Sequence, residues 1–168
     1  MKFRKILISA TAALAFGASA PIAFAQETIV IGEINHYKRM AAFAGPYKQG
    51  LELAVEQINA SGGVLGKPLE FIFRDDQGKP GEAIKIAEEL MTRDGAVMLT
   101  GTILSHVGLA ISSFAAEKGY LYLAAEPLAD ALVWEKGNDY TFRLRASCYM
   151  QAAMLAEEAA KTDAVTYA

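Results

Sequence analysis

The sequence contains little of what covalent or metal-dependent chemistry requires. Cys148 is the only cysteine among 168 residues, so no intrachain disulfide can form, and its thiol is expected to be a small apolar filler. The two histidines, His36 and His106, are far apart, and no group of histidines or carboxylates has the spacing of a metal-binding motif. No nucleophile–base pair and no cofactor fingerprint is present. These absences predict a protein that is not an enzyme and that carries no metal and no cofactor.

Two short motifs suggest chemistry at first sight. Asp75 and Asp76 are paired carboxylates, a combination used for acid–base chemistry and for Mg²⁺ binding. They precede the Gly-Lys-Pro turn at residues 78–80, where a solvated and capping role is the simpler interpretation. The glycines within residues 62–66 lack the Lys-Ser/Thr tail of a phosphate loop and follow a helix, where the helix dipole disfavours anions.

Long apolar runs are confined to the N-terminus. Lys2, Arg4 and Lys5 precede an apolar run over residues 6–16, and Ala-Phe-Ala at residues 23–25 places small residues at a cleavage site. The run is short for a membrane span, although a retained anchor is the alternative. We predict a signal peptide over residues 1–25, cleaved after Ala25, and export of the remainder without membrane insertion.

The charge of the exported part limits its partners. Removal of residues 1–25 takes away three of the 16 basic residues and none of the 19 acidic ones, which changes the formal net charge from −3 to −6. An acidic domain of this kind is a poor candidate for binding nucleic acid or an anionic membrane surface.

Short apolar runs then alternate with amphipathic stretches. Strands are predicted over residues 28–34, 68–74, 96–100 and 120–124, with helices over about 45–60, from Pro80 onward, and around residues 107–115. The apolar stripe of the first helix comprises Tyr47, Leu51, Ala54, Val55 and Ile58. This alternation predicts an α/β fold, with a parallel sheet covered by helices on both faces. Residues 140–144 are expected to be an extended crossing segment, 147–161 a helix and 164–168 a further strand.

One stretch resembles a known family. The segments IVIGEI and GLELAVEQINASGGVLGKPLEFIFRDDQGKP resemble the opening of the branched-chain amino-acid (leucine-type) periplasmic solute-binding proteins, which serve ABC importers. The resemblance implies the type I periplasmic-binding-protein fold and a periplasmic location. It also implies capture of a small solute, an amino acid or related carboxylate, for delivery to the membrane permease of an ABC transporter.

The resemblance further divides the chain. It implies lobe one over residues 26–143, and the hinge and start of lobe two over residues 144–168, with the second lobe mostly missing because full-length members are more than twice as long. Later segments complete lobe one in the family, so some apolar surface is expected to be exposed. A ligand-sensing ectodomain of a signalling receptor and a non-amino-acid solute, such as an aromatic acid, are the alternative functions.

Ligands of open parallel sheets bind beyond the carboxyl ends of the strands, where three loops are expected here. On the first, residues 35–44, Phe43 takes the place of a family aromatic that covers the ligand; a core aromatic that seats the helix is the alternative. Lys38 and Arg39 on this loop could attract an anionic solute.

The second loop spans residues 101–106. Ser105 matches the family's carboxylate-binding serine at a helix N-terminus, where free N–H groups and the dipole favour an anion. Capping by its hydroxyl alone is the alternative. Thr102 belongs to the same candidate site through its backbone, and His106 either lines the cleft or is an exposed first-turn residue.

The third loop, residues 124–128, departs from the family pattern. Glu126 stands where the family has a serine, and a buried carboxylate there would repel an anionic ligand unless it is paired with a residue such as Arg143, Arg145 or His106. Beyond the hinge, Tyr149 is nearest to the family's acidic residue that contacts the ligand's ammonium group. Both departures weaken the transfer of amino-acid specificity.

Overall fold

The computed structural model describes residues 27–162 of the chain. The predicted signal peptide and the strand predicted over residues 164–168 lie outside these described residues. None of the helices within residues 27–162 is both long enough and apolar enough to cross a membrane.

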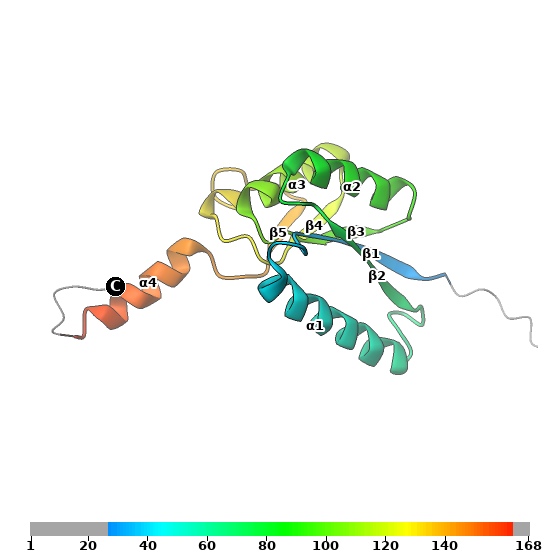
Figure 1. The fold of residues 1–168 in the computed structure, drawn as a ribbon, viewed down its shortest axis with the longest axis horizontal. Helices are drawn as coiled ribbons and strands as arrows, with labels where there is room; N and C mark the ends of the chain where they lie inside the picture. The colour runs from blue at the N-terminus through cyan, green and yellow to red at the C-terminus, as the bar shows by residue number, and fades with distance from the viewer. Residues whose placement is uncertain (1–26, 163–168) are drawn as a thin grey trace, which may run out of the picture.

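Strands and helices alternate along the described chain (Figure 1). Their order is β1 (Ile29–Asn35), α1 (Ala41–Ala60), β2 (Leu69–Asp75), α2 (Pro80–Thr92), β3 (Met98–Gly101), α3 (Ser105–Lys118), β4 (Leu121–Ala124), the 3₁₀ turn η1 (Asp130–Leu132), β5 (Thr141–Arg143) and α4 (Cys148–Ala159).

All strand pairs are parallel, and the sheet order is β2-β1-β3-β4-β5. The four predicted strands are therefore confirmed. The segment expected to be a crossing connection is extended, as predicted, but it also pairs with β4 as a fifth strand. The helix predicted over residues 147–161 is confirmed as α4, which lies away from the sheet (Figure 1).

The main core lies between the sheet and the two helices α2 and α3, which cover one face together (Figure 1). One apolar face of α2 is buried, with Ala83, Ala87 and Leu90 fully inaccessible. Gly32 lets the helix approach β1, because a Cβ at this position would lie 2.9 Å from Cδ1 of Leu90. These contacts fix the direction of β1, from which much of the candidate site projects.

The opposite face is only partly covered, by α1. This helix begins at Ala41, four residues before its predicted start at about residue 45, and Ala54 of its predicted stripe is exposed. A single helix cannot cover five strands, so an apolar hollow of about 230 Å³ remains beside it. Its lining includes Ile31, Tyr47, Leu51, Phe71, Leu123 and Leu144. The expected exposure of apolar surface is thus present on this face.

The environment of Cys148, near the end of the described chain, differs from the one expected. Cys148 is exposed at the first position of α4, so it is not an apolar filler. Ser147 caps that helix by accepting the N–H of Met150 at 3.3 Å.

Candidate functional site

The carboxyl ends of the strands meet at one edge of the sheet, where Asn35 at the end of β1 joins all three predicted loops. Its Oδ1 accepts the backbone N–H of His36 at 2.9 Å and that of Ile103 at 3.1 Å. Its Nδ2 donates to Glu126 at 2.6 Å and to Glu33 at 3.3 Å. One fully buried amide therefore holds the first, second and third loops together. The sequence signal for this role is a polar residue that closes an apolar strand, a pattern too common to predict a junction of three loops.

Glu33 lies beneath this amide and is fully buried within β1. Burial raises the pKa of its carboxyl group to about 8; the hydrogen bonds from Tyr37 and Asn35 oppose this rise, and the charges of Glu126 and Asp76 add to it. The Tyr37 hydroxyl donates to the second carboxyl oxygen. Burial also raises the pKa of Tyr37, so its hydroxyl remains a donor. The surroundings of Glu33 therefore disfavour the ionised form of its carboxyl group.

The second loop places Thr102 in the interior. Thr102 is fully buried in a left-handed conformation with φ 59°, and its hydroxyl is hydrogen bonded to that of Tyr122 in the core. No atom of Thr102 is accessible, so in this structure the residue supports the loop from within. Its own N–H donates to the carbonyl of Ile34 at 2.6 Å, which anchors the loop to β1.

Ser105 is the first residue of α3, but it does not cap the helix. The N-cap is Leu104, without a side-chain hydrogen bond, so the capping alternative is wrong. The Ser105 Oγ instead accepts the N–H groups of Leu128 and Ala129, each at 3.2 Å, and so ties the third loop to α3. Within residues 27–162, no acceptor contacts the N–H groups of residues 104–106. The start of α3 therefore presents free donors at the edge of the sheet.

Glu126 on the third loop has a different partner from those expected. Its carboxylate accepts from Asn35, whereas the Arg143 guanidinium donates to the carbonyls of Leu128 and Ala129. Arg145 is exposed. The expectation of a cationic partner was therefore wrong, because the end of β5 directs Arg143 to the backbone of the loop. The negative charge of Glu126 is held by a neutral amide.

The remaining predicted residues lie at the periphery. Phe43 belongs to the first turn of α1 and is 61% exposed, so it is neither a loop residue nor a core aromatic. His106 is exposed, with its ring nitrogen 3.3 Å from the Gly78 carbonyl. Tyr149 lies on α4, and its ring forms a T-shaped contact with the ring of Trp134, with the two centroids 5.2 Å apart. Within the described chain, no hydrogen bond or ring contact joins Phe43 or Tyr149 to Ser105 and Glu126.

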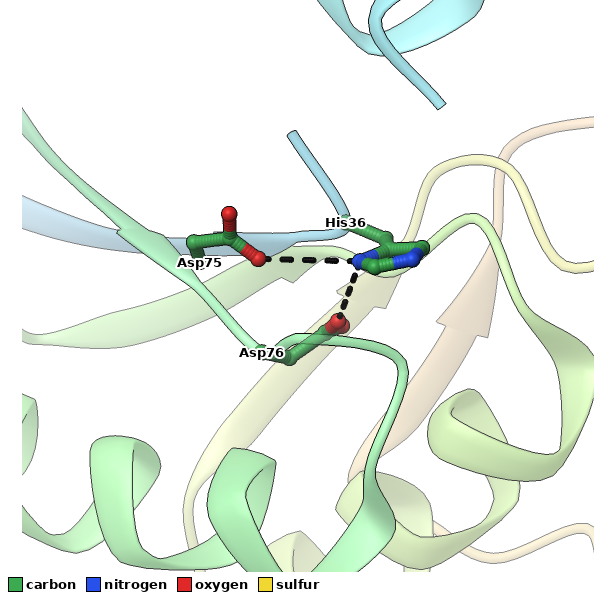
Figure 2. A group of neighbouring side chains, drawn as sticks. All are labelled: His36, Asp75 and Asp76. Carbon is green, nitrogen blue, oxygen red and sulfur yellow. Dashed lines mark ion pairs between the residues drawn. The ribbon is translucent and has the colours of Figure 1, made fainter. Parts of the chain in front are cut away.

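A second polar group lies beside the first, at the ends of β1 and β2 (Figure 2). The register pairs Asn35 with Asp75, so the next residues, His36 and Asp76, also lie side by side. Nδ1 of His36 is 3.6 Å from Oδ1 of Asp75 and 3.8 Å from Oδ1 of Asp76. Asp76 accepts the N–H of Gly78 at 2.7 Å within the turn before α2, but no side chain caps that helix, whose N-cap is Lys79. The predicted solvation is wrong for Asp76, which is fully buried.

The pairing of this group is incomplete. His36 Nδ1 and Asp76 Oδ2 are buried and have no hydrogen-bond partner among the described residues. Burial raises the pKa of Asp76; the Gly78 N–H and His36 oppose the rise, and Asp75 adds to it. The spacing of the sequence concealed this group, because its members are separated by a strand, a helix and a turn.

Known proteins share both the sequence pattern and the fold. Residues 39–167 match the model of the family described as periplasmic binding protein. The chain is 31% identical over 133 residues to the Leu/Ile/Val-binding protein BraC3 of Rhizobium johnstonii, covering 79% of this chain and 35% of the relative. It is 30% identical over 152 residues to the Leu/Ile/Val-binding protein homolog 3 of Brucella melitensis biotype 1, covering 90% of this chain and 40% of the relative.

A solved structure gives the same result. The ABC transporter substrate-binding protein from Desulfitobacterium hafniense, in complex with Leu, superposes with a TM-score of 0.72 at 27% identity, over 80% of this chain and 39% of that one. The chain thus spans well under half the length of these relatives. The type I periplasmic-binding-protein fold predicted from the sequence is confirmed. The chain belongs to the family of periplasmic binding proteins.

Proposed function

We propose that the protein captures an amino acid in the periplasm and delivers it to the membrane permease of an ABC importer. The observation that carries this proposal is the start of α3, where free N–H groups at residues 104–106 lie at the sheet edge beside Ser105. Such a helix start favours a carboxylate through its donors and its dipole. The relatives named as Leu/Ile/Val-binding proteins support the same solute class.

The third loop favours an amino acid over a simple carboxylic acid. Ser105 ties this loop to α3, so the loop that carries Glu126 adjoins the start of the helix. Glu126 is bound by the uncharged amide of Asn35, and its negative charge would complement an ammonium group. A zwitterion offers its carboxylate to α3 and its ammonium group to Glu126. An aromatic acid offers only the first.

The arrangement of the whole protein is part of the proposal. We assign residues 26–143 to lobe one and residues 144–168 to the hinge and the start of lobe two, with the signal peptide cleaved after Ala25. The solute first docks on lobe one, and the second lobe then closes over it about residues 140–146. Closure buries the solute and creates the surface that the permease recognises. Phe43 and Tyr149, both exposed near helix starts, would contact the solute only in the closed form.

The test is a matched pair of solutes on the full-length protein. Leucine and 4-methylpentanoate differ in the amino group, and each is added to a thermal-shift assay and then to calorimetry. We expect leucine or a close relative to raise Tm, since a ligand at 100 times its Kd stabilises by about 2.7 kcal/mol, and the deaminated partner to have little effect. Equal binding of both would remove the role of Glu126, and binding of aromatic acids alone would replace the solute class. Turnover of the bound solute would contradict a transport receptor.

A further inference from the structure

We propose that His36, Asp75 and Asp76 form a binding site for a divalent transition-metal ion, with Zn²⁺ the best-fitting occupant, at the carboxyl ends of β1 and β2 (Figure 2). This site is separate from the start of α3 and does not depend on which solute the protein captures.

The distances within the group suit one shared ion. The three candidate ligand atoms lie within 4.8 Å of one another, and the His36 Nδ1 atom is 3.6 and 3.8 Å from the two carboxylate oxygens. These separations are too long for a direct hydrogen bond. Ligands about 2.1 Å from a tetrahedral ion are about 3.4 Å apart, so the ligand atoms would have to draw together by up to about 1.4 Å when the ion binds.

The unpaired atoms are the independent sign of a missing ligand. His36 Nδ1 is buried without a hydrogen bond, and it points toward the two carboxylates (Figure 2). Asp76 Oδ2 is buried without a partner as well. Buried polar atoms are nearly always paired, because an unpaired one costs free energy. A bound cation would give His36 Nδ1 the partner that it lacks, without requiring that the imidazole be protonated.

Neighbouring backbone groups already hold the ligands in place. Asp76 accepts the N–H of Gly78 at 2.7 Å, and Asp75 accepts those of Gln77 at 2.8 Å and Lys38 at 3.2 Å. Hydrogen bonds of this kind orient the carboxylates of metal sites. The residues themselves follow two strands in fixed register, so little ordering remains to be done when an ion binds.

The donor set selects the type of ion. One imidazole nitrogen and two carboxylate oxygens suit Zn²⁺ and its transition-metal neighbours, whereas Ca²⁺ and Mg²⁺ prefer oxygen ligands alone. Three protein ligands leave one position for water or an anion. His36 also lines a hollow of about 270 Å³, together with Lys38, Arg39, Gln77 and Lys79. The cationic rim favours an anion as the fourth ligand.

The experiment uses tag-free, chelator-treated full-length protein and the metal alone. Calorimetry with Zn²⁺ should give one ion per chain, and Co²⁺ should give the intense visible bands of a four- or five-coordinate site. Asp75→Asn, at the less buried ligand, and His36→Gln should each weaken Zn²⁺ binding on the order of 100-fold. Asp139→Asn, an exposed carboxylate outside the group, is the matched control and should bind Zn²⁺ like the unsubstituted protein.

Three results would overturn the proposal. The first is the absence of stoichiometric Zn²⁺ binding by the unsubstituted protein, which is decisive even if a variant fails to fold. The second is equal Zn²⁺ affinity in Asp75→Asn and in the Asp139→Asn control. The third is tighter binding of Ca²⁺ or Mg²⁺ than of Zn²⁺. None of these results bears on amino-acid capture, which is measured separately with leucine.

Discussion

Two buried polar groups lie side by side at the carboxyl ends of β1 and its neighbours, and they differ in how completely their atoms are paired. In the group around Asn35, the amide oxygen and nitrogen each make two hydrogen bonds, and both oxygens of Glu33 accept one. In the group around His36, two buried atoms have no partner among the described residues. The paired group positions the loops, whereas the unpaired group is suited to receive an ion.

Asn35→Ala should break the paired group with the largest effect on stability. The substitution removes four hydrogen bonds and leaves buried partners unsatisfied, each of which costs about 1–3 kcal/mol. We expect the free energy of unfolding in urea to fall by roughly 3–4 kcal/mol. Gln49→Ala, an exposed substitution on α1, should change it by less than about 0.5 kcal/mol. A loss below about 1 kcal/mol for Asn35→Ala would show that the amide is not the junction of the loops.

Glu33→Gln should reveal the cost of the buried carboxyl group. The pKa of Glu33 is raised from 4.5 to about 8, so between these values the folded protein holds a proton that the unfolded chain has released. Stability from this group is present below about pH 4.5 and is lost as the pH rises through 8. Glutamine cannot ionise, so the variant should be more stable than the unsubstituted protein at pH 9, by about 2–4 kcal/mol, with little difference at pH 4.5.

Urea unfolding at several pH values measures this difference. Glu56→Gln, at an exposed position of α1, is the control and should leave the pH dependence unchanged. Parallel pH profiles for Glu33→Gln and the unsubstituted protein would mean that Glu33 ionises normally in the folded state.

Ser105→Ala tests the link between the paired group and the solute. The loss of the acceptor for Leu128 and Ala129 should reduce stability by about 1–2 kcal/mol. If the hydroxyl also contacts the solute carboxylate, the affinity for leucine should fall by about 10- to 100-fold. Ser113→Ala, whose hydroxyl bonds only the Leu109 carbonyl on an exposed part of α3, is the matched control. Unchanged leucine affinity with reduced stability would make Ser105 a support for the third loop alone.

Asp76→Asn should have the smallest effect on the free energy of unfolding, and it should raise stability where Asn35→Ala lowers it. It removes a buried charge with an unpaired oxygen, while the asparagine oxygen can still accept the Gly78 N–H. We expect the metal-free variant to be about 1 kcal/mol more stable in urea than the metal-free unsubstituted protein. A loss comparable to that of Asn35→Ala would place Asp76 in a fully paired network and remove the contrast between the groups.

The sequence predicted the fold well because its evidence was local. The alternation of apolar runs and amphipathic stretches predicted four parallel strands and the helices between them. The fifth strand was missed because a three-residue segment has too little pattern to predict its pairing. The α1 stripe was overestimated because the sequence does not show that this helix covers only part of a face.

The candidate site could be predicted only in outline. The loops followed from the strand ends, but the roles of Asn35, His36 and Asp76 arise from the register between β1 and β2, across a helix and a turn. Ser105 was placed correctly at the start of α3, but neither ligand contact nor capping anticipated its bond to Leu128, because the approach of the third loop is a tertiary contact. The available signal of a functional edge was the polar end of the apolar β1 run: Glu33 and Asn35 within the strand, and His36 directly after it.

The contact between Trp134 and Tyr149 gives the protein a built-in optical probe. Trp134 is the only tryptophan in the sequence, and its ring meets that of Tyr149 on α4, the helix that lies away from the sheet. Rotation of α4 would separate the rings and change the polarity around the indole, so its emission maximum and quenching would follow the movement. Stopped-flow fluorescence of this 168-residue chain could therefore time a rotation of α4.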